Sequence, residues 1–299
     1  MSTEPTQSVE PTSAEGERPT LTPHTLIRRF TPWQRATHAA LALSVFGLVL
    51  TGMPLKYSTS FWAGPLMWLF GGPDFAGTIH RVCAVLFFIS GAMHLLGLIG
   101  GLLKRDFTPP FSPDGILPRL VDLRQVPQNI RYLKGKGPKP EFAKFSYFEK
   151  FDYLAEVWGL IVIGGSGLIM WFPVQASNWL PGWTVNAALI FHSYEALLAM
   201  GFLFTIHFIN THLRPDVFPV DRVIFSGSMP AHEVEERYAG WWSRVLADPS
   251  RYVVPGEESK TRALHFLSGT FLIVGFTIFG LAMLSALVEV IGYIVNYFD

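Results

Sequence analysis

The stretch VNAALIFHSYEALLAMGFLFTIHFINTH occupies residues 185–212 and contains one acidic residue, Glu195, and no Lys or Arg. A bilayer core about 30 Å thick is crossed by about 20 helical residues, so this stretch is long and apolar enough to span a membrane. It must be helical there, because unpaired backbone amides are too costly in hydrocarbon. It also carries three histidines, His192, His207 and His212, so both the fold and the chemistry depend on it.

Other segments of the chain have the same character, and they lie at 34–55, 78–103, 153–172 and 264–295. Of the 299 residues only 15% are charged and 49% are hydrophobic, with a mean hydropathy of +0.31. Soluble domains are about 25% charged, so this chain has too little polar surface to enclose a water-soluble globule of its size. The sequence therefore predicts an all-α integral membrane protein, with a four-helix bundle at 23–213 and a fifth transmembrane helix at 264–299.

Two further properties of the composition exclude whole classes of function. The chain has one cysteine, Cys83, which excludes a disulfide framework, a thiolate zinc cluster, a cysteine-ligated iron–sulfur cluster and covalent haem attachment. The 23 basic residues balance 23 acidic ones, and this zero net charge argues against a nucleic-acid partner.

Lys and Arg are distributed unevenly over the two sides that five spans define. Four precede the first span, ten lie between the second and third spans, and seven lie between the fourth and fifth. The opposite side carries only Lys56 and Arg81. Because cytoplasmic loops are the ones enriched in Lys and Arg, the N-terminus is predicted to be cytoplasmic and the C-terminus periplasmic.

The segments outside the spans differ from one another in composition. Residues 1–22 are rich in Ser, Thr, Pro and Glu, which predicts a disordered tail rather than a signal peptide, so the first span is expected to remain as an anchor. The connections 104–152 and 214–263 are predicted to be cytoplasmic loops. For the basic first connection two interpretations stay open: a solvated loop, or a lid or docking surface beside a cofactor site.

Six of the nine histidines lie in the spans or at their edges: His38, His80, His94, His192, His207 and His212. A lone histidine in a span often does no more than hydrogen-bond a neighbouring helix. Here the spacing indicates more. His80 and His94 are 14 residues apart in one span, and His192 and His207 are 15 residues apart in another. At about 100° and 1.5 Å per residue, the two members of each pair lie broadly on one helix face, near opposite membrane surfaces. Neutral imidazole is a good axial ligand of iron, so the pattern suits two haems stacked across the membrane.

The predicted depths of the histidines limit which of them can share a haem, but they do not identify every pair. His80 and His192 are predicted to lie at similar depth near the outer surface. Near the inner surface His38, His94 and His207 compete, and geometry alone leaves open which two would share a haem. Small residues at the outer ends of two spans, Thr51-Gly52 and Ser166-Gly167, allow close approach of a helix or a flat cofactor.

Four stretches together resemble the dihaem cytochrome b subunits of formate dehydrogenase and nickel–iron hydrogenase, within the bacterial cytochrome b561-like group. They are RFTPWQRATHAALALSVFGLVLTGMPL (29–55), GTIHRVCAVLFFISGAMH (77–94), YFEKFDYLAEVWGLIVIGGSGLIMWF (147–172) and FHSYEALLAMGFLFTIHFINTH (191–212). The resemblance covers the first four predicted spans and leaves the fifth outside.

The resemblance implies specific ligands for two haems b. His38, in an Arg-x-x-His context that begins at Arg35, and His207 would hold the inner haem, and His80 and His192 would hold the outer one. Arg81, beside His80, is expected to pair with the outer haem propionates. The chain departs from the family in a 15- rather than 14-residue interval between His192 and His207. Three additional histidines leave a third haem open: His94, His212 and His265.

The family further implies a quinone site beside the inner haem, with a polar Asn-x-x-Gln-Lys type of motif at the start of the third span. The matching stretch here is SYFEK (146–150), followed by Asp152. The expected quinone-binding residues are therefore Ser146, Glu149, Lys150 and Asp152.

These features predict an electron-transfer subunit of a quinone-linked respiratory oxidoreductase complex in the bacterial inner membrane. The chain has no catalytic site for the terminal chemistry, so a periplasmic partner is expected, either a multihaem cytochrome c or an iron–sulfur or metalloenzyme subunit. Two alternatives stay open. One is a haem-free transporter or assembly subunit whose histidines relay protons, and the other is a cytochrome b561-like module without a dehydrogenase partner.

Overall fold

A computed structural model describes residues 21–103, 112–215, 217–218, 220–256 and 262–298. Five helices in it are long and apolar enough to cross a membrane: Pro32–Lys56, Pro73–Leu103, Tyr147–Trp171, Trp183–Leu213 and Gly269–Asn296. They contain the five predicted spans almost completely, and the prediction of an all-α integral membrane protein is confirmed. Residues 1–20 of the predicted N-terminal tail lie outside the described residues.

Local sequence signals explain where two of these helices begin. Helix α1 (Pro32–Lys56) starts after Thr31, whose side chain accepts from the backbone N–H of Gln34 while the Gln34 side chain accepts from Thr31. Helix α5 (Tyr147–Trp171) starts after Ser146, which forms the same reciprocal cap with Glu149. Such caps satisfy backbone donors at the end of a helix, so α5 begins six residues before the apolar segment predicted at 153–172.

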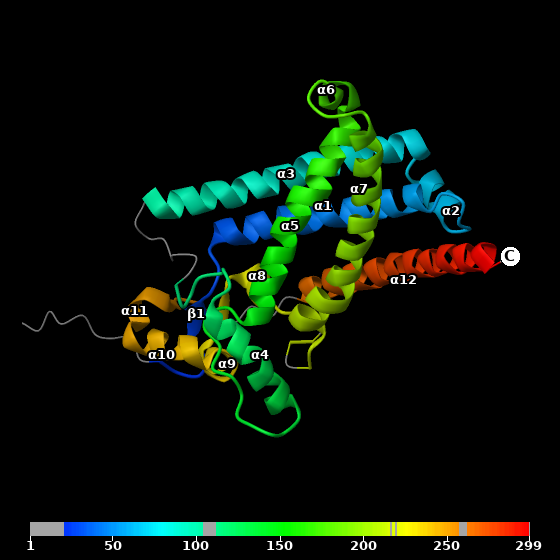
Figure 1. The fold of residues 1–299 in the computed structure, drawn as a ribbon. Coiled ribbons are helices and arrows are strands. Elements are labelled where there is room, and N and C mark those ends of the chain that lie inside the picture. Colours follow the sequence, from blue (N-terminus) through cyan, green and yellow to red (C-terminus); the bar gives the residue numbers. More distant parts are fainter. Residues whose placement is uncertain (1–20, 104–111, 216, 219, 257–261, 299) are drawn as a thin grey trace, which may run out of the picture.

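The first four spans are arranged as two antiparallel pairs (Figure 1). Helix α1 packs along α3 (Pro73–Leu103), and α5 packs along α7 (Trp183–Phe202), whereas contacts between the two pairs are sparse. Short helices connect each pair on the predicted outer side, α2 (Ala63–Leu69) in the first pair and α6 (Pro173–Ser177) in the second. Helix α7 continues into two π-helical turns, η1 (Leu203–His207) and η2 (Ile209–Leu213).

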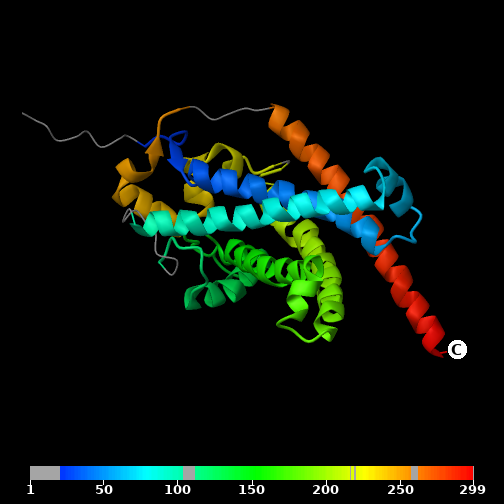
Figure 2. The ribbon, with the colours of Figure 1, turned by 90° about the horizontal axis from the view of Figure 1, so that it is seen from above.

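The fifth span, α12 (Arg262–Phe298), lies against α1, α7 and η1 (Figure 2). Its close approach depends on Gly275, because a Cβ at this position would overlap the edge of the Phe204 ring. Phe204 is fully buried and also packs against Phe276 and Phe279 of α12. The contact joins the fifth helix to the end of the fourth span.

Replacing Gly275 with Val is therefore expected to destabilise the protein by about 1–3 kcal/mol, because the added methyl groups must displace a fully buried ring. Thermal unfolding of the detergent-solubilised full chain measures the effect. Gly280→Val is the matched control, since a Cβ at Gly280 on the same helix meets no atom within 4 Å. Equal melting temperatures for the two variants would show that α12 does not depend on this contact.

On the predicted cytoplasmic side the chain forms a small folded unit. Strand β1 (Leu26–Arg28) pairs antiparallel with β2 (Ser228–Pro230) and β3 (Val253–Val254), in the order β2-β1-β3. Four short helices lie among these strands: α8 (Val223–Ser226), α9 (Ala231–Arg237), α10 (Ala239–Ala247) and α11 (Pro249–Tyr252). A separate hydrophobic core, with Ile27, Val234 and Trp241 at its centre, holds the unit together. The segment 214–263, predicted only as a loop, thus folds with the residues that precede α1.

The other long connection contributes one helix, α4 (Leu120–Leu133), beside the start of α5 (Figure 1). This connection is joined by polar contacts to the folded unit of β1, β2, β3 and α8 to α11, which we call the cytoplasmic unit. Arg244 Nε donates to Asp114 at 2.9 Å, and Lys139 Nζ donates to the Glu236 carbonyl at 2.9 Å. Both long connections and the N-terminal strand therefore meet at one end of the helical bundle.

Candidate functional site

Two histidines predicted to share a site face each other between the two helix pairs. His80 on α3 and His192 on α7 have ring centroids 6.2 Å apart, with an angle of 69° between the ring planes. Both side chains are half-buried. Neutral imidazole is a good ligand of haem iron. Two imidazoles brought this close from facing helices could together hold one haem, which would supply one-electron chemistry there.

The hydrogen bonds of these two imidazoles fix their tautomers. His192 Nδ1 lies 2.9 Å from the Ile163 carbonyl, which can only accept, so Nδ1 carries the proton. His80 Nδ1 lies 2.9 Å from the Thr51 hydroxyl, which donates its own proton to the Gly47 carbonyl at 2.7 Å and therefore accepts from His80. In both rings the lone pair remains on Nε2, and no described residue hydrogen-bonds to that atom.

The small residues beside these histidines form two matching cradles. A Cβ at Gly52 would fall 3.0 Å from His80 Cε1, and one at Gly167 would fall 3.1 Å from His192 Cε1. In each helix pair, a hydroxyl residue and the glycine that follows it on the first helix contact the histidine of the second helix. In the second pair, Ser166 Oγ lies 3.4 Å from His192 Nδ1. Thr51-Gly52 and Ser166-Gly167 thus orient the rings rather than only allowing close helix approach.

A second group of histidines lies toward the predicted inner membrane surface. His207 Nδ1 is 3.2 Å from Asp152 Oδ2 on α5, so the ring can donate to a carboxylate and keep Nε2 unprotonated. The imidazole of His38 on α1 lies within electrostatic range of those of His207 and His212. His38 and His207 thus come from different helix pairs, as His80 and His192 do.

The π-helical turn at η1 explains the unusual spacing on the fourth span. His207 is the last residue of η1 and follows His192 by 15 residues. A π-helical turn accommodates one extra residue. The 15 residues therefore advance about as far round the helix as 14 would in a regular α-helix, so the departure from the family interval is offset by the backbone.

The additional histidines have other partners. His94 Nε2 lies 3.0 Å from the hydroxyl of Tyr153 on α5. His212 Nδ1 accepts the backbone N–H of Asp221 at 3.2 Å, so its neutral form carries the proton on Nε2. The His212 ring stands edge-on to His207, with centroids 6.4 Å apart. His265 belongs to α12, but its side chain lies outside the described part of the structure.

The residues predicted to bind quinone occupy the start of α5, and most of them already have partners. Ser146 caps the helix, and both its N–H and its hydroxyl donate to Glu149 Oε2, at 2.7 and 2.9 Å. Lys150 is 1% exposed and donates to both carboxylate oxygens of Asp122 at 2.9 Å. Asp152 bonds to His207 through Oδ2, whereas its buried Oδ1 has no hydrogen-bond partner among the described residues.

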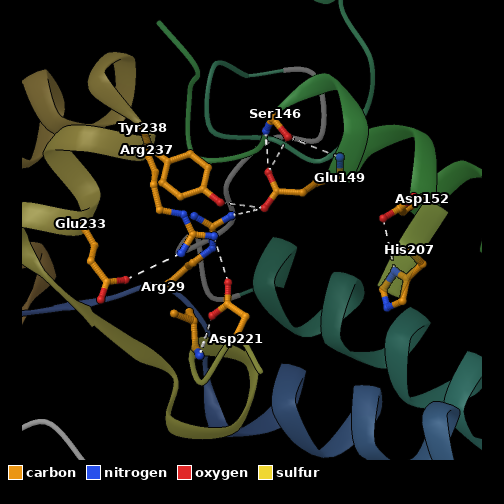
Figure 3. A network of polar contacts seen from close by, with 10 residues as sticks. Arg29, Ser146, Glu149, Asp152, His207, Asp221, Glu233, Arg237 and Tyr238 are labelled. Atoms are coloured by element: carbon orange, nitrogen blue, oxygen red, sulfur yellow. Dashed lines mark hydrogen bonds and ion pairs between the residues drawn. The ribbon is translucent and has the colours of Figure 1, made fainter. Parts of the chain in front are cut away.

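Glu149 joins α5 to the unit formed by β1, β2, β3 and their short helices through a partly buried polar network (Figure 3). Its Oε1 accepts from Arg29 at 2.6 Å and from the Tyr238 hydroxyl at 2.9 Å. Burial raises the pKa of Tyr238 to about 12, so the hydroxyl remains protonated and donates. The Arg29 guanidinium also lies 4.0 Å from the Tyr238 ring centroid. Asp221, which contacts His212, accepts from Arg237 at 2.9 Å in the same region.

Two residues near the inner group were not singled out in the sequence. Glu156, one turn after Asp152 on α5, is within electrostatic range of His207. The i,i+4 spacing of two acids inside an apolar span was the available signal. Asp221 lies in a connection with no comparable pattern. The exposed Arg81 follows His80 directly on α3, as the sequence requires.

Buried polar atoms without partners occur on the predicted inner side. Besides Asp152 Oδ1, the Nε of Arg35 is buried and unpaired within the described residues. Arg35 lies one helical turn before His38. A charged donor and a carboxylate with unused hydrogen-bonding capacity suit a bound group that carries polar substituents, and the imidazoles of His38 and His207 could ligate its iron.

Comparison with known proteins agrees with this geometry. The sequence matches the family described as prokaryotic cytochrome b561 over residues 29–220, which includes the first four spans and all six histidines discussed above. A comparison with curated proteins gives no match. The match places this chain among the multi-pass membrane cytochromes b of bacterial electron transport, which bind haem b in the inner membrane. Since the matched region includes well over half of the residues, the chain belongs to the prokaryotic cytochrome b561 family.

Proposed function

We propose that this protein is the membrane-anchoring cytochrome b subunit of a respiratory complex, and that it connects the quinone pool with a periplasmic redox partner. Two haems b are proposed, one held by His80 and His192 and one by His38 and His207. The observation that carries the proposal is the facing pair His80 and His192, at 6.2 Å between ring centroids, with both Nδ1 protons donated to the protein.

When bound, each haem supplies reversible one-electron chemistry at its iron. The chain's own residues set the conditions for it. Thr51 and the Ile163 carbonyl orient the outer ligands, and Asp152 orients His207 in the same way. Such outer contacts fix the tautomer and raise the basicity of an imidazole ligand. Arg81, exposed beside His80, is proposed to hold the outer propionates.

Two haems rather than three are favoured by the contacts of the additional histidines. His94 already engages Tyr153 through Nε2, and His212 holds its Nε2 proton because Nδ1 accepts from Asp221. A pyridine haemochrome assay of the purified chain is therefore expected to give b-type haem at about two per polypeptide. A value near three would assign a further ligand role to these residues, and a value of zero would restore the haem-free alternative.

Quinone exchange is proposed at the cytoplasmic face, at the start of α5. Ser146, Glu149 and Lys150 are held in hydrogen bonds and ion pairs, so their proposed contribution is to shape this face. Asp152 differs from them, because its buried Oδ1 is free to exchange a proton or a hydrogen bond with a quinol. An inhibitor of this site should shift the spectrum or potential of the inner haem more than that of the outer one.

Replacing Asp152 with Asn is expected to slow haem reduction by a quinol analogue by about 100-fold, the typical contribution of a positioned acid or base. The amide still accepts from His207, so the haem content should not change. Stopped-flow reduction of the purified protein measures the rate, and the exposed Asp248 provides the control substitution Asp248→Asn. Equal rates for the two variants would remove Asp152 from proton exchange.

A periplasmic partner is proposed because the residues that the structure describes include no cluster of three or more His, Cys, Asp or Glu side chains that could hold a further metal ion for a terminal reaction. The partner would be a multihaem cytochrome c or an iron–sulfur or metalloenzyme subunit that meets the outer end of the bundle beside α2 and α6. Co-purification from membranes after mild cross-linking tests this part of the proposal. Recovery of the cytochrome without a redox partner would favour a cytochrome b561-like module that serves a soluble acceptor.

A further inference from the structure

Helix α4 has an inverted distribution of polar and apolar residues. Its polar residues face the protein: Asp122 accepts from Lys150, Gln125 Nε2 donates to the Glu141 carbonyl at 3.2 Å, and Asn129 donates to the Tyr147 hydroxyl at 3.0 Å. Asp122 and Gln125 are only 6% and 8% exposed. A helix that packs on a soluble core turns its apolar face inward, so α4 is not held by the hydrophobic effect within this chain.

The apolar residues of α4 point away from the protein. Leu120, Leu123 and Leu133 are 80%, 70% and 73% exposed, and Ile130 is 45% exposed. At about 100° per residue, these four side chains fall within an arc of about 140° on one side of the helix. A contiguous apolar stripe of this width on a short helix indicates contact with an apolar phase or partner.

Basic residues border the apolar stripe. Arg124 and Arg131 project at one edge of it, and Lys134 follows the last residue of the helix, with all three exposed. The only acidic residue of the helix, Asp122, is neutralised by its ion pair with Lys150. The charged residues exposed on the outward surface of α4 are therefore all cationic, and this is the composition of helices that lie in the headgroup region of anionic membranes.

The contacts of α4 also place it at the level of the membrane surface. Tyr147 and Lys150, its partners, belong to the first turn of α5, where that span enters the bilayer. Figure 1 shows α4 beside this end of α5 and outside the helical bundle. At this depth the outward side of α4 meets lipid, and the cytoplasmic leaflet carries the anionic lipids that attract clustered Lys and Arg.

We propose that α4 is an interfacial helix, with Leu120, Leu123, Ile130 and Leu133 inserted into the cytoplasmic leaflet and with Arg124, Arg131 and Lys134 bound to anionic phospholipid headgroups. The Lys150–Asp122 ion pair fixes this helix to the start of α5. Lipid composition would then act on the same helix end that carries the proposed quinone face.

The depth of α4 is tested on the full chain in nanodiscs of phosphatidylcholine and phosphatidylglycerol. A nitroxide is attached to Leu123→Cys or Leu133→Cys in a Cys83→Ser background, with the exposed Gln128→Cys as control. Labels at 123 and 133 are expected to be relaxed more by oxygen than by a water-soluble nickel chelate, and the label at 128 the reverse. Strong relaxation by the chelate at 123 would overturn the proposal. Protection from both reagents would also overturn it, because it would show a second copy or a partner protein covering the stripe.

The lipid specificity is tested by pairing two double variants with the same change in charge. Arg124→Gln with Arg131→Gln alters the border of the stripe, and Arg28→Gln with Arg251→Gln alters exposed residues of the cytoplasmic unit. Electron spin resonance with spin-labelled lipids gives the preference for phosphatidylglycerol over phosphatidylcholine. The first variant should lose up to about 30-fold of this preference and the second should keep it. No loss in the first variant, or equal loss in both, would refute headgroup binding by α4.

Discussion

Full-length protein with His80→Ala or His192→Ala is expected to bind about half the haem of the unaltered protein, because either change removes one of the two ligands proposed for the outer haem. The two rings lie with centroids 6.2 Å apart, where they could hold one haem together, so the two single variants should have the same spectrum. A pyridine haemochrome assay normalised to polypeptide measures the loss.

The surface residue His232 provides the control for this experiment. It lies on α9 and bonds to the Pro23 carbonyl through Nδ1, far in sequence from the spans, so His232→Ala should keep the full haem content. Full low-spin b-type absorbance in either the His80 or the His192 variant would contradict the outer assignment.

Removal of the inner haem is the second large effect, and it distinguishes the competing histidines. His38→Ala and His207→Ala are each expected to abolish the inner low-spin signal in electron paramagnetic resonance, because each removes one proposed ligand. His94→Ala should leave that signal in place, because the Nε2 of His94 is engaged with Tyr153. If His94→Ala removes the signal and His38→Ala does not, the inner ligands are His94 and His207.

The membrane spans could be predicted from the sequence because each depends on a property that is local in the chain. About 20 consecutive apolar residues are sufficient to define a span, whatever it packs against. The sheet could not be predicted, since β1, β2 and β3 have three residues or fewer and pair across 200 or more positions. The extension of α5 to Tyr147 was missed because its first turn is polar, although the Ser146 and Glu149 cap was visible in the sequence.

The candidate site could also be predicted only in part. Histidines in apolar spans are visible in any sequence, and their spacing indicated which of them share a depth. The contacts that set their chemistry are not visible. Nothing local relates Thr51 to His80 or Asp152 to His207, because each pair is brought together only when two helices pack. The π-helical turn that ends at His207 has no amino-acid composition that distinguishes it from an α-helix. The extra residue between His192 and His207 therefore looked like an irregularity in the sequence.

The partners of Glu149 show a structural contribution that its motif does not reveal. Its position in the stretch SYFEK suggested a direct contact with quinone. In the folded chain its carboxylate accepts from Ser146, Arg29 and Tyr238, which come from three separate parts of the sequence. The Arg29–Glu149 ion pair is only partly buried, because the Glu149 side chain is 29% exposed, so breaking it should cost less than the about 3–5 kcal/mol of a fully buried pair. Variants of Glu149 therefore report on stability as well as on the quinone face.

The pairing of β1 with β3 sets an order of events during synthesis. Leu26 leaves the ribosome early, but its partner Val254 is made only after four of the five spans. At translation rates of roughly 5–20 residues per second, β1 must wait on the order of ten seconds or more with an open edge. The sheet therefore closes late, after the first four spans have been made, and it joins two segments from opposite ends of the chain. Mutations at this edge would be felt most by the nascent chain, as loss of inserted protein, and least by molecules that have already assembled.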